Sequence, residues 1–547
     1  MKRLLLAALL ASPLGCTTAT DTAMAPAPPP PAAYAPGEPR VTTLDSRAPL
    51  VTIRVMVTHG STSEPVGKEG LASMTAEMIT DGGYRTASGI MTKEELAEMT
   101  MPWGSGARPS AFPSSRTTTF FFTAPREVIG QYVRDVLQPM LNEPVFAAGE
   151  LDRLKNERLS TISSLRSVNL ENLGLSAIEQ YVLAGTRYEH HSIGTEASIP
   201  SFTRDDVIAF YRAHYRPENI IAGISTADPD IVSQVRDAVR SVNRDAATPP
   251  PAPPLQARPA RFEGREALVI EEPNAPAASV HFGFPIEVNR THPDFWPLYV
   301  ANVWLGTHRD SFGQLYQQIR EERGYNYGNY SYVEAWSGRP AALFQLFNQP
   351  REQQYFSIWI RPVKHEHAVH LMKAATYELE EMVRNGLTAE QLAATKNKAR
   401  VLYLNLGETV PRLISARVDD VFYGMEGRGF LDTYLENVDR VTVEQVNAAL
   451  RRHLRTEDIK YLVVTSPPHV EATVAQIRSS GPVFGKSYSE YEFTQAKLPD
   501  GTTVWQIPES KVPTVQLDAA WAHYPLNVRE VRTGHVKDMF AAPRLLR

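Results

Sequence analysis

The sequence is poor in cysteine, because Cys16 is the only one among 547 residues. An internal disulfide and a metal site built from several thiolates are therefore excluded. A large charge excess is also missing: the net charge is −5, and no concentrated basic patch argues for a nucleic-acid partner. The apolar run Leu4–Leu10 is too short to span a bilayer.

The first residues nevertheless have the form of an export signal. Lys2 and Arg3 precede the apolar run, and small residues lead through Leu14-Gly15 to Cys16. Leu-Gly-Cys resembles a bacterial lipobox, which implies that Cys16 is diacylated and becomes the mature N-terminus. An ordinary cleaved signal with a chance cysteine is the alternative. Thr17 is not the aspartate that serves as a retention signal in enterobacteria, so we expect an outer-membrane anchor facing the periplasm.

Two proline-rich stretches divide the chain. Residues 17–40 are rich in Ala, Pro and Thr and include Pro28–Pro31, which predicts a stiff, extended tether. The second stretch runs from Ala247 to Arg261. Because few contacts are expected to cross it, we interpret it as an interdomain linker.

The segments on either side of this linker repeat each other. Each contains a helix with a Thr cap and an acidic first turn, then a short turn and a buried strand. Matching residues lie 239 positions apart without a gap: Thr203/Thr442, Val207/Val446, His214/His453, Glu218/Glu457 and Ile220/Ile459. A fixed offset over this length indicates two duplicated domains.

Strand and helix patterns alternate in both halves. Val51–Val57 and Ala278–Phe284 have the composition of strands, and helical patterns cover Ala147–Ser167, Trp296–Leu305 and His367–Asn385. Mixed order within each half predicts two α+β domains.

The segment Gly67–Met78 reads GKEGLASMTAEM and follows a strand and a glutamate-bearing loop. It resembles the zinc helix of the insulinase/pitrilysin family of metallopeptidases, in which Gly-Leu-Ala precedes His-x-x-Glu-His. In that family the two His bind zinc and the Glu acts on the metal-bound water. Ser73, Ala76 and Glu77 stand at these three positions.

The resemblance therefore implies a zinc helix without zinc. Ser73 is a poor zinc ligand, Glu77 has lost its pair, and Ala76 removes the general base. The family's third ligand, a Glu on a later helix, aligns near Leu159, and Glu157 is the nearest carboxylate. We expect a plain packed helix with polar groups on one face, and no metal or catalytic residue in this chain.

Two histidine clusters offer a replacement site. His365, His367 and His370 lie at a predicted helix start, and His190-His191 lies where the family has a loop. The spacing does not reproduce His-Glu-x-x-His. We expect a solvated helix N-terminus for the first cluster and a structural loop for the second.

The second half keeps a different family phrase. Leu315–Tyr327 resembles Leu-x-x-x-x-Arg-Glu-x-x-Gly-x-x-Tyr, with Arg320 and Tyr327 at the positions whose side chains bind the peptide in active members. A guanidinium and a phenol can donate to carbonyl oxygens in a closed cavity. In the alternative interpretation, Arg320 pairs with a neighbouring Glu and Tyr327 fills the sheet.

The resemblance covers about residues 41–470 and implies two similar domains that face each other like a clam shell. The predicted organisation is a lipoprotein signal (1–16), a tether (17–40), an N-terminal insulinase-like domain (41–240), a linker (241–264), a C-terminal insulinase-like domain (265–468) and an extension wrapping it (469–547).

The leading functional hypothesis is a metal-free, lipid-anchored subunit that clamps peptides and pairs with a His-x-x-Glu-His-bearing homologue, which carries the zinc. Its substrates would add as a strand to a sheet edge. One alternative is a peptide-binding or scaffold lipoprotein of the cell envelope without a peptidase partner. The other is an active zinc metalloendopeptidase with displaced ligands.

Overall fold

The structure is a computed structural model of the chain. It describes residues 37–168, 170–244, 263–336, 342, 348–485, 494–497, 499–500, 503–506 and 512–543. The predicted signal with Cys16, most of the tether and most of the interdomain linker lie outside these residues. Within the described ranges, every helix is too short or too polar to cross a membrane.

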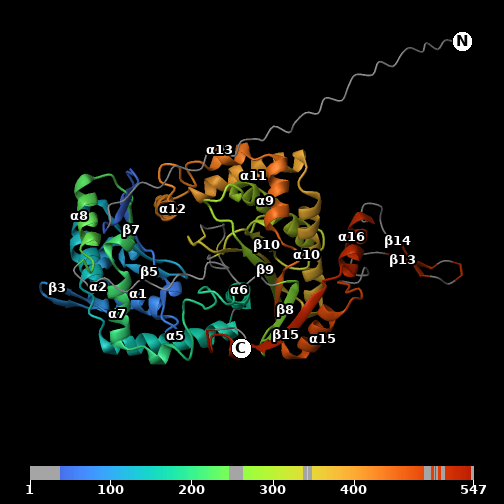
Figure 1. Cartoon of the computed structure of the whole chain (residues 1–547), viewed down its shortest axis with the longest axis horizontal. Helices are drawn as coiled ribbons and strands as arrows, with labels where there is room; N and C mark the ends of the chain where they lie inside the picture. The colour runs from blue at the N-terminus through green and yellow to red at the C-terminus, as the bar shows by residue number, and fades with distance from the viewer. Residues whose placement is uncertain are drawn as a thin grey trace, which may run out of the picture.

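Each half is built on one mixed β-sheet (Figure 1). The first sheet has the order β1-β7-β2-β6-β5. The second has the order β10-β11-β9-β12-β8-β15. The strands of the first sheet are β1 (Arg40–Thr43), β2 (Leu50–Val57), β5 (Ser110–Pro113), β6 (Thr118–Pro125) and β7 (Ile220–Ile224), and those of the second are β8 (Arg265–Glu271), β9 (Ala278–Ile286), β10 (Asn329–Tyr332), β11 (Gln354–Val363), β12 (Lys460–Thr465) and β15 (Val528–His535).

The two sheets share one topology. In the first, β7 lies parallel to β1 and antiparallel to β2, which continues antiparallel into β6 and β5. In the second, β12 lies parallel to β8 and antiparallel to β9, which continues antiparallel into β11 and β10. The predicted α+β fold with two duplicated domains is confirmed.

The helices surround these sheets. The predicted segments are helical within one or two residues of their expected ends. In the first half they are α1 (Leu71–Asp81), α2 (Lys93–Thr100), α3 (Ile129–Tyr132), α4 (Gln138–Asn142), α5 (Ala148–Val168), α6 (Leu170–Val182), α7 (Arg204–His214) and α8 (Pro229–Arg240), together with the hairpin β3 (Tyr84–Thr86) and β4 (Gly89–Met91). In the second half they are α9 (Phe295–Gly306), α10 (Ala368–Asn385), α11 (Ala389–Leu406), α12 (Val410–Phe422), α13 (Tyr434–Arg440), α14 (Val443–His453), α15 (Pro467–Arg478) and α16 (Val512–His523), with the hairpin β13 (Thr494–Lys497) and β14 (Thr503–Gln506).

The repeated helices α7 and α14 begin in the same way. The Thr203 hydroxyl accepts the Asp206 N–H, and the Thr442 hydroxyl accepts the Gln445 N–H. In both helices the side chain of the third residue accepts a hydrogen bond from the N–H of the capping threonine. Two backbone donors at each helix start are therefore satisfied. The Thr caps predicted from the repeat are confirmed.

Each half contributes one helix that packs on the sheet of the other half; these two are called the exchanged helices below. Helix α6 of the first half packs on β9, β11 and β12, and α12 of the second half packs on β1, β2 and β7 (Figure 1). Both contacts need a glycine, because a Cβ on Gly174 would lie 2.1 Å from His281 Nε2 and one on Gly223 would lie 2.4 Å from Val418 Cγ2. The exchanged helices therefore fix the two sheets relative to each other.

The C-terminal extension contacts both halves. Strand β15 lies parallel to β8 at the end of the second sheet. Beyond it, Met539 and Phe540 join the hydrophobic core of the first half. The Phe540 ring meets the His191 ring edge-on with centroids 5.6 Å apart, and Arg166 Nε donates to the Met539 carbonyl at 3.0 Å. The extension thus reaches past the second domain, which it was expected to wrap.

Candidate functional site

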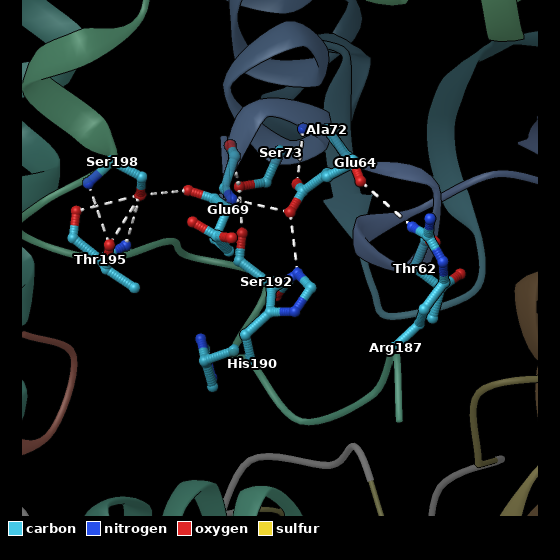
Figure 2. Close-up of polar contacts among 12 residues, drawn as sticks. Thr62, Glu64, Glu69, Ala72, Ser73, Arg187, His190, Ser192, Thr195 and Ser198 are labelled. Carbon is cyan, nitrogen blue, oxygen red and sulfur yellow. Dashed lines mark hydrogen bonds and ion pairs between the residues drawn. The ribbon is translucent and has the colours of Figure 1, made fainter. Parts of the chain in front are cut away.

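The start of α1 is held by the glutamate-bearing loop before it. The Glu64 carboxylate accepts the N–H groups of Gly70 at 2.9 Å and Ala72 at 2.8 Å (Figure 2). Gly70 has φ +95°, and a Cβ there would lie 2.6 Å from Gly194 Cα, so the position requires glycine. A buried carboxylate is well placed here because it satisfies free N–H groups at the positive end of the helix dipole.

Glu64 also binds His190 from the facing loop, with His190 Nε2 2.9 Å from Glu64 Oε2 (Figure 2). Burial disfavours the charged imidazole, but the hydrogen bond and the charge of Glu64 together raise the pKa of His190. His190 thus serves as the structural loop residue that the sequence predicts.

Ser73 occupies the first of the three motif positions and is buried. Its hydroxyl donates to the Ser192 carbonyl at 2.6 Å (Figure 2). It also accepts a hydrogen bond from Arg158 Nη1. Ser73 therefore ties α1 to the loop and to α5.

Arg158 of α5 spans the first and third motif positions. Besides Ser73, its guanidinium pairs with the Glu77 carboxylate, at 2.8 Å from Nη2 to Oε1 and 3.1 Å from Nε to Oε2. Nη1 also donates to the Ile193 carbonyl at 3.0 Å. The Arg158 side chain is 5% exposed. A fixed positive charge therefore lies between Ser73 and Glu77, the two side chains at the positions where the motif that this segment resembles has its histidines.

Arg158 is not predicted from the sequence. Only the residues on either side of it, Glu157 and Leu159, are candidates there for the position of the family's third zinc ligand. Glu157 is 59% exposed and pairs with Arg153 on the outside of α5. Leu159 packs against the apolar core. The packed helix with polar groups on one face is present as expected, and the structure adds that these polar groups, Ser73 and Glu77, bind a buried cation. The pattern that could have predicted this contact is a serine and a carboxylate one helical turn apart, Ser73 and Glu77, together with an arginine on a later helix.

The residues present do not fit a zinc ion. A catalytic zinc needs three good ligands and an open position. Ser73 offers a weak ligand, Ala76 none, and Glu77 is already paired with Arg158. The guanidinium would also repel a divalent cation at this place.

One other group of three side chains has metal-like spacing among the described residues: His292, Asp294 and His453. Asp294 Oδ2 is already bound by His453 Nε2 at 2.7 Å and by Arg452 Nη1 at 2.5 Å. The Asp294 N–H donates to His292 Nδ1 at 3.0 Å. The carboxylate is thus already paired with Arg452 and hydrogen-bonded to His453, and one His292 nitrogen is occupied.

The histidines at the start of α10 are not solvated, and that expectation is wrong. His367 and His370 are buried. His370 Nδ1 donates to the Val483 carbonyl at 2.9 Å, so the C-terminal extension covers this helix start. His365 stacks on His469 with centroids 4.2 Å apart and bonds Thr465.

Arg320 and Tyr327 flank the end of a short π-helical segment, Tyr316–Glu321. The Arg320 guanidinium lies over the Tyr316 ring at 4.6 Å, and its Nε is 3.9 Å from Glu321 Oε1. Tyr327 is 75% exposed, so it does not fill the sheet. No contact between the two is among those of the described residues, and their role as a peptide clamp stays a prediction.

A cavity of about 350 Å³ lies between the halves, beside the loop that holds Ser73. Edge strand β5, helix α6 and the His190–Ser192 loop form the first-half wall, and residues near β10 and β11 form the other. The Glu179–Arg351 ion pair, 2.7 Å long, joins the two walls. The lining residues are Phe112, Pro113, Ser114, Ser115, Leu165, Asn172, Leu175, Ser176, Glu179, Gln180, His190, His191, Ser192, Ala335, Trp336, Gln349 and Arg351.

Two family models match the sequence of this chain. The model described as Insulinase (Peptidase family M16) matches residues 40–195, and the one described as Peptidase M16 inactive domain matches residues 201–399. The chain belongs to the insulinase family. Arg320 and Tyr327 lie inside the second match, and the substituted helix α1 lies inside the first.

Relatives in this family include both peptidases and a respiratory subunit. A protein named uncharacterized zinc protease from Streptomyces coelicolor is 26% identical over 264 residues, 47% of this chain and 53% of that protein. The chain thus spans about half the length of that relative. Subunit 1 of the mitochondrial cytochrome b-c1 complex of Caenorhabditis elegans is 24% identical over 77% of this chain and 84% of its own. The solved peptidase M16 inactive domain from Pseudomonas fluorescens has a TM-score of 0.67 at 20% identity, covering 79% of this chain and 97% of that one.

Proposed function

We propose that this chain is a non-catalytic insulinase-family subunit that binds peptides and completes a peptidase together with a zinc-bearing homologue. The observation that carries the proposal is Arg158, whose guanidinium takes the place between Ser73 and Glu77. The family fold, a cavity between the halves and a helix start anchored by Glu64 surround it. A chain that kept the family scaffold and lost only the metal chemistry is suited to a complementary role.

Peptides would enter along the edge strand β5, whose residues Phe112 and Pro113 line the cavity. This strand is the last of its sheet, so an extended segment could pair with its free edge. Arg320 and Tyr327 would then act on the peptide held next to the partner's zinc, donating to its carbonyl oxygens.

The location that goes with this role is the cell envelope. Lipidation of Cys16, followed by the proline-rich tether of residues 17–40, would hold the two-domain body near a membrane, and the absence of aspartate at Thr17 favours the outer membrane. Membrane fractionation of the native chain against a Cys16→Ala variant tests this. Loss of the variant from the membrane fraction is expected, and its full retention would contradict the lipid anchor.

The subunit role is tested by mixing the purified chain with the product of a His-x-x-Glu-His-bearing gene and measuring cleavage of an unfolded peptide. Cleavage is expected in the mixture, with zinc found in the partner. Arg320→Ala and Tyr327→Phe should reduce the rate of the mixture. Unchanged rates would contradict the clamp, and stoichiometric zinc with cleavage by this chain alone would revive a self-sufficient peptidase.

A second candidate is a scaffold or peptide-binding lipoprotein without a peptidase partner. It is favoured by the similarity to a protein named as a subunit of the cytochrome b-c1 complex. Absence of cleavage in every mixture, with the chain recovered in a larger envelope complex, would select this candidate over the peptidase subunit.

A further inference from the structure

The C-terminal extension passes from one half to the other within a few residues. Val531 belongs to the hydrophobic core of the second half, whereas Val536, Met539 and Phe540 belong to the core of the first half. Each of these four side chains is at most 9% exposed. The crossing lies beyond residue 399, where the matched family regions end.

The second half holds the first part of this segment along a full strand. Strand β15 lies parallel to β8 from Val528 to His535. Arg265, the first residue of β8, donates from Nη1 to the Leu526 carbonyl at 3.0 Å. The Leu526 side chain is buried in the second-half core. Because the ladder, the buried arginine and the core contacts act together, this part is the anchor of the segment.

The first half holds the end of the segment through separate contacts, since the ladder with β8 has ended before these residues. Arg166 of α5 donates from Nε to the Met539 carbonyl and from Nη2 to the Lys537 carbonyl, each at 3.0 Å. The Glu196 N–H donates to the Phe540 carbonyl at 2.7 Å. Side-chain burial and these hydrogen bonds therefore take the place of a continuous ladder at this end.

The backbone of Phe540 has a conformation that its own side chain disfavours. Its φ is +62°, in the left-handed region, where a bulky L residue is uncommon. The contacts with the first half must therefore hold this residue in place. When they break, the residue can return to an ordinary conformation, which favours release of the end as one discrete step.

The crossing lies at the edge of the molecule opposite to α12. In Figure 1, α5 and β15 lie along the lower edge, whereas α12 lies above them. Helix α12 ties the second half to the first sheet along its length, and this contact includes the buried Arg54–Asp419 ion pair, 2.8 Å long. Helix α6 is separate from α5, so it can stay on the second sheet when α5 moves. Helix α12 is therefore suited to be the hinge between the halves, and the crossing to be the latch.

Two ion pairs beside the cavity do not prevent such a motion. The Arg116–Glu352 pair joins the halves at 2.8 Å, but Glu352 is 50% exposed, and exposed ion pairs contribute little to stability. The Glu179–Arg351 pair joins α6 to the segment before β11. Because α6 packs on the second sheet, this pair can move with the second half.

We propose that residues 526–540 form a strap that locks the two halves together, and that its end, residues 536–540, releases so that the first half turns about α12. The Phe540 ring contacts the ring of His191, which lines the cavity between the halves. Release therefore widens this cavity on the side of that histidine. The proposal concerns the motion of the chain and does not depend on the proposed function.

The test measures the distance between spin labels on the two halves of the full chain by double electron–electron resonance. Cys16→Ala removes the single native thiol, and Ser160→Cys in α5 and Ala472→Cys in α15 place the labels at exposed positions. A main population at the latched distance is expected in this reference chain. Met539→Asp puts a carboxylate into the first-half core and should raise a second, longer-distance population at least about tenfold.

A second variant releases the end without adding a charge. A chain that stops after His535 keeps β15 and lacks residues 536–547, and the same longer-distance population is expected. The matched control is Phe484→Asp on the same extension, which adds the same charge at a side chain 53% exposed and should leave the distance unchanged. Val536→Ala should raise the longer-distance population about three- to tenfold, whereas Val531→Ala, the same change on the anchored side, should not.

Thermal unfolding verifies that each variant is folded, and the truncated chain decides the question if Met539→Asp is not. An unchanged distance distribution in the folded truncated chain would overturn the proposal, as would equal effects of Val531→Ala and Val536→Ala. Cleavage in the mixtures with a zinc-bearing homologue does not enter this result, so the strap and the subunit role stand or fall separately.

Discussion

The helix that follows β2 in the first half and the one that follows β9, its counterpart in the second half, differ sharply. In the first half, α1 carries Ser73 and Glu77, which bind the buried Arg158. In the second half, α9 is apolar on nearly all sides, and its buried polar group Asn302 donates to a backbone carbonyl, that of Ser331, at 3.0 Å. Around α9 the space is filled by aromatic rings, among them Trp296 stacked on Phe430 with centroids 5.1 Å apart.

This difference shows that the fold and the chemistry of the side chains it carries vary independently. The same strand order and helix placement accept either a polar cluster or an aromatic core, so the topology alone does not maintain a metal site. In the first half the polar cluster contains a buried guanidinium, that of Arg158. The polar character of α1 is what distinguishes this part of the first half from the apolar α9 of the second half.

The largest effect is expected from an attempt to restore the metal. Ser73→His, Ala76→Glu and Glu77→His together rebuild the motif but leave Arg158 at its centre. We expect this triple variant to hold no stoichiometric zinc, because a buried cation repels the metal and a third ligand is missing. Adding Arg158→Glu removes the charge and supplies a carboxylate, so zinc should then bind stoichiometrically.

Metal analysis after dialysis against zinc, followed by gel filtration, measures both variants. The triple variant is the matched control for the quadruple one, since they differ only at residue 158. Stoichiometric zinc in the triple variant would show that Arg158 does not block the position.

The exchange of α6 and α12 is the next target. Gly174→Ala places a Cβ against the buried His281, and Gly223→Ala places one against Val418. Each should lower the free energy of unfolding by about 2–4 kcal/mol, because the packed helix must shift off the sheet. Gly149→Ala in α5 is the control, since a Cβ there meets nothing within 4 Å.

Urea unfolding at constant pH measures these changes. Gly149→Ala should be neutral or stabilise by up to about 1 kcal/mol, as a helical glycine gains propensity. Similar losses of unfolding free energy in all three variants would contradict a specific contribution of the close contacts between the halves to stability.

The Arg158 cluster can also be broken directly. Arg158→Met leaves the Ser73 hydroxyl and the Ile193 carbonyl without a donor and frees Glu77, which is 39% exposed and can regain water. We expect a loss of about 1–3 kcal/mol of unfolding free energy. Arg153→Met, on the same helix, removes partly exposed ion pairs and should cost less than about 1 kcal/mol. Equal costs in the two variants would contradict a structural role for the buried cation.

The sequence predicted what depends on neighbours along the chain. The Thr203 and Thr442 caps, the limits of α9 and α10 and the duplicated topology all follow from local pattern and repeat. Arg158 was missed because its partner Glu77 is distant in sequence and only the packing of α5 on α1 brings them together. His370 was expected in solvent because nothing local reveals that the Val483 carbonyl covers it. The packing of α6 and α12 on the opposite sheets likewise cannot be predicted from the sequence, because the apolar pattern of a helix does not specify which sheet it packs on.

The smallest expected effect is a pH dependence that differs between two adjacent histidines near α1. The pKa of His190 is raised in the folded chain, so its stabilisation is complete below about pH 6.5 and is lost as the pH rises through the folded value. Burial lowers the pKa of His191 to about 4, so its contribution is present above about pH 6.5 and is lost as the pH falls. The stability difference between native chain and His190→Gln should therefore grow as the pH falls toward about 6.5 and stay constant below it. The difference for His191→Gln should shrink by about 1 kcal/mol between roughly pH 6.5 and 5.5. Urea unfolding from above pH 6.5 down to about pH 5.5 measures both changes, and a His190→Gln difference that shrinks as the pH falls toward 6.5 would contradict the pairing of His190 with Glu64 at the start of α1.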